Sequence, residues 1–239
     1  MTSLAVFQNS LHGISHRARG FLGMVEHLCC QYHGQQMRDD GSAYMDHVHD
    51  VMRQIVEIER ACGKKRIDWA TVCAGGCHDL IEDSYAAEVP VTPEIIQQAF
   101  SVVDPRFGRD VAFVVSAVSK RRREDFADKA ERLAEYHERL FRLAHHDYRA
   151  LLVKYPDRLH NLATLHGLTT TDPSKVERVA QETLDFYVPR GRNEALGILP
   201  KCYHEIFSNM VDRMERLALA YLVDKYQISY VNISRTLFS

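Results

Sequence analysis

The sequence has no long apolar run, little cysteine and almost no excess charge. None of its apolar segments approaches the roughly 20 residues of a membrane span, and the start, MTSLAVFQNSLHG, lacks the basic and apolar regions of a secretion signal. Six cysteines scattered over 239 residues are too sparse for a disulfide scaffold. The formal net charge of −2 excludes a basic face for nucleic acid. We therefore expect a cytoplasmic protein with reduced thiols that binds neither nucleic acid nor membranes.

Helical hydrophobic periodicity runs through nearly the whole chain. From Tyr44 the apolar residues follow one stripe of a helix that stops near Gly63, and Asp68 is a suitable N-cap for the next helix, which carries Trp69 to Ile81. Further helices are expected from Thr92-Pro93, around Phe113–Val118, from about Glu124 to His145, through DYRALLVKYPDRLHNLATL, from a cap at Ser174 to a stop before Pro189, and from about 203 to 225. We predict an all-α fold, with one domain at 1–198 and a C-terminal helical extension at 199–239.

The segment CHDLIEDS places candidate metal ligands close together in sequence. On a helix, His78 and Glu82 lie four residues apart, as do Asp79 and Asp83, so all four project from one broad side. An imidazole beside a carboxylate can bind a divalent ion such as Mn²⁺, Fe²⁺ or Zn²⁺. The same residues also suit an ordinary exposed helix end, so this segment alone leaves both interpretations open.

Two further segments carry residues of the same types. YMDHVHD has His47 near the start of its helix, and KYPDRLHNLATL contains Asp157. Helices packed around one core could bring both residues to His78 and Asp79 on a single ion.

The order His, His-Asp, Asp resembles that of HD-type metal-dependent phosphohydrolases. The segments QQMRDDGSAYMDH, HDLIEDS, KYPDRLHNLATL and VAQETLDFYVP also resemble, in this order, the hydrolase domain of RelA/SpoT-type alarmone enzymes, and MERLALAYL resembles the segment that follows it. The resemblance covers about residues 20 to 226 and implies an HD-domain helical bundle. Since no synthetase domain follows within the 239 residues, we expect a stand-alone hydrolase.

The resemblance also implies roles for individual residues. It implies one Mn²⁺ ion with four ligands, His47, His78, Asp79 and Asp157. It implies that two carboxylates, Glu82 and Asp83, orient or deprotonate the attacking water. It implies that four side chains contact the nucleotide, with Arg38 against the guanine base and Tyr44, Asn161 and Thr164 along the pocket. The implied reaction removes pyrophosphate from the 3′ position of ppGpp or pppGpp and gives GDP or GTP.

Departures from the family pattern keep other functions open. Asp39 stands where the family usually has a basic residue, and this removes a cation beside a highly anionic substrate. An adenine alarmone, an NADPH-like 2′-phosphate or a simple nucleotide therefore stays a possible substrate. A non-catalytic nucleotide-binding module, with the C-terminal helix as a surface for homo-oligomers, is a further alternative.

Two positions near the expected ligands challenge a regular helix. Gly75 and Gly76 weaken their helix by up to ~2 kcal/mol relative to alanine, or else they permit close helix packing. Pro156 precedes Asp157, and an interior proline removes a backbone hydrogen bond. We predict a kink or a new helix start at Pro156.

The other polar candidates have simpler interpretations. His145-His146-Asp147 imitates the His-Asp doublet, but a solvated turn is favoured over a second metal site. The run SKRRRED is typical of a solvated loop, with a basic rim at Lys120 to Arg123 that attracts phosphates as the alternative. Surface or core positions are expected for the remaining candidates, His49, His137, His160, His166, His204, Cys73 and Cys77.

Overall fold

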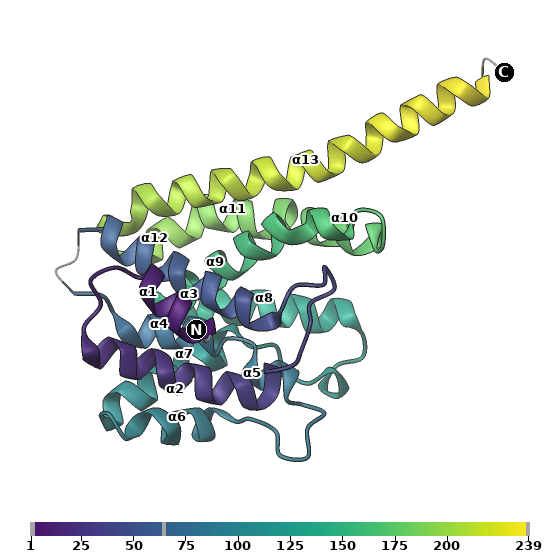
Figure 1. Ribbon diagram of the computed structural model, residues 1–239. Coiled ribbons are helices and arrows are strands. Elements are labelled where there is room, and N and C mark those ends of the chain that lie inside the picture. The colour runs from purple at the N-terminus through teal and green to yellow at the C-terminus, as the bar shows by residue number, and fades with distance from the viewer. Residues whose placement is uncertain (1–2, 64–65, 238–239) are drawn as a thin grey trace. The chain divides into compact units, whose positions relative to one another are not determined.

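Every named element in the described part of the chain is a helix, as Figure 1 shows for the computed structural model. The structure describes residues 3–63 and 66–237. Within these ranges the β pairing is limited to an isolated antiparallel bridge between Met37 and Ala43. The predicted all-α fold class is therefore confirmed. No helix in the described ranges has both the length and the apolar character needed to cross a membrane.

The chain divides into two compact units, Met1–Arg38 with Ser42–Asp157 and Asp39–Gly41 with Arg158–Ser239. The predicted boundary at 198 stays a prediction. The first unit contains α1 (Ser3–Ser10), α2 (His16–His33), α3 (Tyr44–Ala61), α4 (Trp69–Gly76), α5 (Leu80–Asp83), α6 (Pro93–Ser101), α7 (Pro105–Val118), the 3₁₀ turn η1 (Arg123–Asp125), α8 (Lys129–Ala144) and the first half of α9 (Arg149–Thr164).

The second unit contains the end of α9, the 3₁₀ turn η2 (Leu165–Leu168), α10 (Pro173–Glu182), the π-helical turn η3 (Thr183–Tyr187), α11 (Val188–Arg190), the π-helical turn η4 (Gly191–Ala195), α12 (Leu196–Ile198), the 3₁₀ turn η5 (Lys201–Tyr203) and α13 (His204–Leu237). Within this unit α13 packs along α10, η3 and α11 (Figure 1). The predicted last long helix is confirmed and extends to Leu237. Side chains of residues 224–237 lie outside the described ones, and a dimer contact through this helix stays a prediction.

Helix α4 lies against α2, α3 and α7 in the core of the first unit. Its two glycines make this approach possible. A Cβ atom added to Gly75 would lie 2.2 Å from Ile55 Cδ1, and one added to Gly76 would lie 2.4 Å from Val25 Cγ1 and 2.8 Å from Met52 Sδ. The interpretation of the two glycines as a site of close helix packing is confirmed.

The expected single helix from Trp69 through Ile81 is wrong, because α4 ends at Gly76 and α5 begins at Leu80. His78 and Asp79 therefore lie in the turn between two helices. The His78 Nδ1–H group donates to the Gly75 carbonyl at 2.7 Å. This carbonyl would otherwise accept the next helical bond, so the histidine side chain replaces backbone continuation at a point where glycine already disfavours it.

Of the three N-caps predicted by name, two are confirmed and one is wrong. Asp68 caps α4 by accepting from Ala70 N at 3.0 Å, and Thr92 caps α6. The cap predicted at Ser174 is wrong. Asp172 caps α10 instead, with Pro173 in the first helical position, while Ser174 donates its own hydroxyl to Asp172 at 2.8 Å.

Two further helix starts differ from the prediction. The helix expected from about Glu124 begins only at Lys129, because Asp128 caps it there. The new helix start predicted at Pro156 is wrong, since α9 continues through the proline. Its flanking side chains, Leu152, Val153 and Tyr155, are fully buried, and this packing outweighs the missing hydrogen bond. A kink at Pro156 stays a prediction.

The stop predicted before Pro189 is also wrong. The chain remains helical through the proline to Ile198, by way of the π-helical turns η3 and η4. In η3 the Val188 N–H donates to the Thr183 carbonyl, five residues back. This wider turn redistributes hydrogen bonds beside a residue that lacks a donor.

The glycine packing predicts a specific stability effect. Gly76→Ala is expected to lower the free energy of unfolding by about 1–3 kcal/mol, because its methyl group must displace Val25 and Met52. Urea unfolding followed by circular dichroism measures the change. Gly23→Ala is the matched control, since a Cβ atom there meets nothing within 4 Å and should stabilise α2 by roughly 0.5–1 kcal/mol. Equal effects of the two substitutions would contradict the packing argument.

Candidate metal centre

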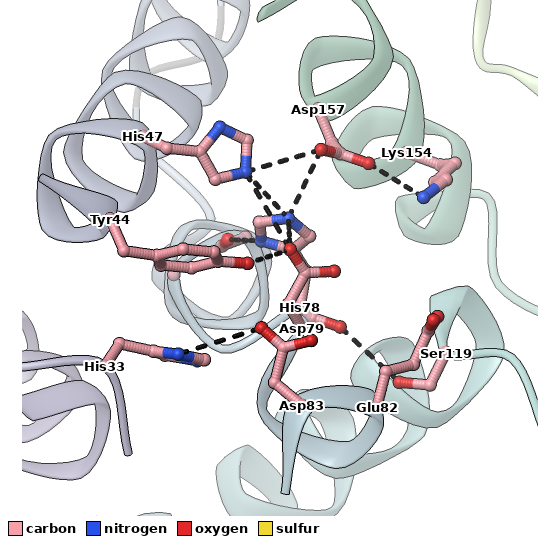
Figure 2. A network of polar contacts seen from close by, with 12 residues as sticks. His33, Tyr44, His47, His78, Asp79, Glu82, Asp83, Ser119, Lys154 and Asp157 are labelled. Atoms are coloured by element: carbon pink, nitrogen blue, oxygen red, sulfur yellow. Dashed lines mark hydrogen bonds and ion pairs between the residues drawn. The ribbon is translucent and has the colours of Figure 1, made fainter. Parts of the chain in front are cut away.

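Four side chains from three segments converge in the first unit (Figure 2). His47 lies in the first turn of α3, His78 and Asp79 lie in the turn before α5, and Asp157 lies in α9. One ligand atom from each lies within 4.8 Å of the others. The structure thus brings together all four residues of the predicted ligand set.

The distances within this group are those of donor atoms that face a common point. The two imidazole Nε2 atoms of His47 and His78 are 3.2 Å apart. Asp157 Oδ1 lies 3.4 Å from the His47 nitrogen and 3.3 Å from the His78 nitrogen. Asp79 Oδ2 lies 3.0 Å from His78 Nε2 and 3.9 Å from His47 Nε2. Two nitrogen and two carboxylate ligands suit a divalent transition-metal ion.

Three of the four ligands, His78, Asp79 and Asp157, are oriented by a neighbour outside the group. The Nδ1–H bond from His78 to Gly75 leaves its Nε2 lone pair for a ligand. Tyr44 donates its hydroxyl to Asp79, and Lys154 lies 2.7 Å from Asp157 Oδ2 (Figure 2). Lys154 thereby holds one oxygen of Asp157 and leaves the other facing the two imidazoles. These supports favour one arrangement of the four donors.

The electrostatics of the group also fit a cation. Burial, reinforced by the charge of His78, holds the pKa of His47 well below its usual value, so His47 stays neutral. Burial lowers the pKa of His78 too, but the carboxylates of Asp79 and Asp157 outweigh it and raise that pKa well above the usual value. The centre therefore has a negative potential strong enough to retain a positive charge in a buried position. The residues present fit a divalent cation.

The two carboxylates that follow the ligand turn have different surroundings (Figure 2). Glu82 accepts a hydrogen bond from the Lys120 backbone N–H at 2.6 Å, and the Lys120 ammonium lies 3.5 Å from its other oxygen. Asp83 is 35 % exposed and lies 3.8 Å from His33 Nδ1. Burial and the negative charge of Asp79 raise the pKa of Asp83. Glu82 is thus held in place by Lys120, whereas Asp83 is the more exposed of the two carboxylates.

The predicted nucleotide contacts are distributed over both units. Tyr44 lies at the metal centre, where it holds Asp79. Arg38 lies in a short loop, and its backbone N–H donates to the Ser42 carbonyl at 2.8 Å. Asn161 and Thr164 belong to the second unit, where the Thr164 hydroxyl contacts the Asn161 carbonyl at 3.2 Å. Their roles toward a nucleotide stay predictions.

Two residues at the centre, Lys154 and His33, were not predicted from the sequence. Lys154 stands one helical turn before Asp157, a spacing that places an ion pair on one helix face and could have revealed it. His33 is buried and stacks on Tyr44 with ring centroids 4.3 Å apart. No local signal distinguishes it from the other histidines.

The remaining candidates of the sequence analysis have structural roles. His145 and His146 are exposed, and Asp147 pairs with Arg149 at 2.6 Å. The described residues contain no second group of metal-ligand type, so a second centre there is not supported. His49 is a buried core histidine that contacts Glu26 at 2.8 Å, as expected.

Comparison with known proteins identifies the family. A family model described as HD domain matches residues 26–198. The chain is 34% identical over 157 residues to the bifunctional (p)ppGpp synthase/hydrolase SpoT of Escherichia coli K12. The aligned region covers 66% of this chain and 19% of SpoT. It is 32% identical over 164 residues to a probable guanosine-3′,5′-bis(diphosphate) 3′-pyrophosphohydrolase of Synechocystis, with 68% and 19% covered. It is 31% identical over 193 residues to the GTP pyrophosphokinase rsh of Brucella ovis, with 80% and 21% covered.

The chain is an all-helical protein, and its largely buried group of two histidines and two aspartates fits a divalent cation. Since the HD model spans most of the sequence, the chain belongs to the HD domain family. The resemblance to RelA/SpoT-type enzymes is confirmed by the named relatives. The chain spans about a fifth of the length of these relatives.

The centre predicts that metal binding depends on His78. His78→Ala is expected to weaken Mn²⁺ binding by more than about 100-fold, beyond the loss caused by removing an outer partner of a ligand. Isothermal titration and metal analysis after dialysis measure affinity and stoichiometry. His146→Ala is the control and should retain one ion per chain, because this exposed residue lies outside the group. Equal loss in both variants, or none in His78→Ala, would refute the assignment.

Proposed function

We propose that this chain is a hydrolase that removes the 3′-pyrophosphate of the guanosine alarmones ppGpp and pppGpp, with one Mn²⁺ ion as cofactor. The observation that carries this proposal is the meeting of four donor atoms, three of them from buried residues, with a Glu-Asp pair in the next helical turn. The names of two relatives, a bifunctional (p)ppGpp synthase/hydrolase and a probable guanosine-3′,5′-bis(diphosphate) 3′-pyrophosphohydrolase, support the choice of substrate.

The ligands of the ion are His47, His78, Asp79 and Asp157. When bound, Mn²⁺ acidifies water and offsets negative charge on a phosphoryl oxygen. Tyr44 and Lys154 keep the two carboxylates in position for it. The imidazoles contribute neutral nitrogen ligands that borderline divalent ions accept more readily than Mg²⁺ or Ca²⁺ do.

The Glu-Asp pair handles the attacking water. In the proposed reaction, water attacks the phosphorus bound to the 3′ oxygen, and the bond between this phosphorus and the 3′ oxygen breaks. Pyrophosphate is released, and the 3′ oxygen takes up a proton from solvent water to become a hydroxyl. Asp83 accepts the proton of the water, because it is the more exposed of the two carboxylates and because burial and the charge of Asp79 raise its pKa. Glu82, held through both oxygens by Lys120, orients the water.

The nucleotide is bound by Arg38, Tyr44, Asn161 and Thr164. An arginine face can stack on the guanine base, and the other three side chains offer hydrogen bonds. Asp39 forms an ion pair with Lys175, and the positive charge of Lys175 offsets its negative charge. This pairing weakens the argument for an adenine alarmone that rests on Asp39.

A substrate panel tests the proposal. With Mn²⁺ present, purified protein should release pyrophosphate from ppGpp and pppGpp with a higher kcat/KM than from adenine alarmones, NADPH or GTP. A chelator should abolish the release, and added Mn²⁺ should restore it. If metal-loaded protein released no pyrophosphate from ppGpp or pppGpp, the proposal would be wrong. A higher kcat/KM for another member of the panel would identify that compound as the better substrate.

Replacing the carboxylates separates an enzyme from a nucleotide-binding module. Glu82→Gln and Asp83→Asn should each lower kcat by about 10²–10⁴-fold, because each removes a group that handles the water. Their Mn²⁺ affinity, measured by isothermal titration, should stay near that of the wild type, since neither residue is among the four ligands. Unchanged turnover in both variants would contradict the assigned roles.

A further inference from the structure

The cations of the basic run 120–123 take different positions in the first unit. Arg121 is 58 % exposed and lies 3.7 Å from Glu135. Arg122 lies over the ring of Tyr85, 5.2 Å from its centroid. Lys120 instead contacts Glu82, next to the metal centre. The run is therefore not a uniform rim, and Lys120 is the member that contacts the proposed catalytic residues.

The backbone of Lys120 is fixed from three directions. Its N–H donates to Glu82 at 2.6 Å, and its carbonyl accepts from the Tyr85 hydroxyl at 2.6 Å. The preceding carbonyl, of Ser119, accepts a hydrogen bond from the buried guanidinium of Arg139. The origin of the Lys120 side chain is thus set by hydrogen bonds from α5, α8 and the segment after α5.

The ammonium group of Lys120 rests on an aromatic platform. Its Nζ lies 4.8 Å from the centroid of Tyr136, a fully buried ring of α8. This contact favours a cation without using its hydrogen-bond donors. An ammonium has three donors, and the single hydrogen bond described for this one reaches Glu82 at 3.5 Å. The side chain is 27 % exposed, so an anion can approach it.

Lys154 provides an informative contrast. Its Nζ also lies near the Tyr136 ring, 5.6 Å from the centroid, but the side chain is only 9 % exposed and contacts Asp157 at 2.7 Å. Lys154 is committed to a metal ligand. The ammonium of Lys120 lies 3.5 Å from Glu82, a long contact, and its side chain is partly exposed. These are the properties of a cation that can exchange one anionic partner for another.

We propose that the ammonium of Lys120 contacts the pyrophosphate group of the substrate and of the released product. This inference rests on the proposed function and adds a phosphate subsite to it. Three carboxylates lie at the centre (Figure 2), and their side chains, of Asp79, Glu82 and Asp83, are 27 %, 18 % and 35 % exposed. A pyrophosphate group that enters there meets strong repulsion, and the fixed cation at Lys120 offsets part of it. A charge-assisted hydrogen bond to a phosphate oxygen replaces the long contact with Glu82.

Binding of inorganic pyrophosphate tests this subsite without catalysis. Mn²⁺-loaded protein is titrated with pyrophosphate in a constant excess of Mn²⁺, so that every variant receives the same Mn²⁺–pyrophosphate complex. Lys120→Met should weaken this binding by about tenfold or more, the typical loss for a charged hydrogen bond. Lys120→Arg should retain most of it. Mn²⁺ affinity should not change in Lys120→Met, because the bond to Glu82 comes from the backbone.

Arg121→Met is the matched control, since it removes a neighbouring exposed cation that pairs with Glu135. It should bind pyrophosphate like the wild type. Equal weakening in Arg121→Met would show a general effect of local charge and overturn the assignment to Lys120. Wild-type binding in Lys120→Met, or no pyrophosphate binding by the wild type, would overturn it as well.

The same variants distinguish this inference from the proposed function. If pyrophosphate binds through Lys120 but ppGpp is not hydrolysed, the proposed function fails and the subsite stands. If ppGpp is hydrolysed and Lys120→Met leaves both its KM and the pyrophosphate affinity unchanged, the subsite fails and the proposed function stands.

Discussion

Two imidazoles and two carboxylates lie close together in the first unit, and three of the four residues are almost fully buried. Ionised carboxylates in such a place are costly unless positive charge accompanies them. The chain supplies part of that charge through Lys154, and the two carboxylates raise the pKa of His78. A divalent ion at this group would supply the remaining positive charge. The ion-pairing and hydrogen-bonding partners of the ligands are consequences of this one electrostatic constraint.

The constraint can be met only if the ligand turn reaches into the core. Gly75 and Gly76 let α4 approach α2 and α3 more closely than any side chain would allow. Because α4 ends there, the next residues turn sharply, and His78 and Asp79 point toward His47 instead of following a helix face. Residues that weaken a helix by their intrinsic propensity thus position the ligands through packing. The local cost and the functional gain belong to the same two positions.

The sequence reveals the chemistry of the site better than its geometry. Caps at Asp68 and Thr92 and the choice of ligand residues follow from local side chains and from motif order, which a sequence displays directly. The turn at His78 depends on a bond back to Gly75, and the continuation of α9 through Pro156 depends on buried neighbours. The π-helical turns around Pro189 depend on hydrogen bonds with a wider spacing. Such tertiary effects override local propensity and have no signature in a short window of sequence.

The near-neutral charge of the chain would leave the binding of the proposed polyanionic substrate to a few local cations. With a formal net charge of −2, the global field does not draw phosphates in, and the partly exposed residues Glu82 and Asp83 add negative charge beside the ligand turn. Individual lysine and arginine side chains must therefore be held in position, so that they do not simply form close ion pairs with the nearest carboxylate. Tyr136 offers such support to two lysines at once, one directed to Asp157 and one beside Glu82. A single buried ring in α8 thus links Lys154, which contacts Asp157, with Lys120, which contacts Glu82.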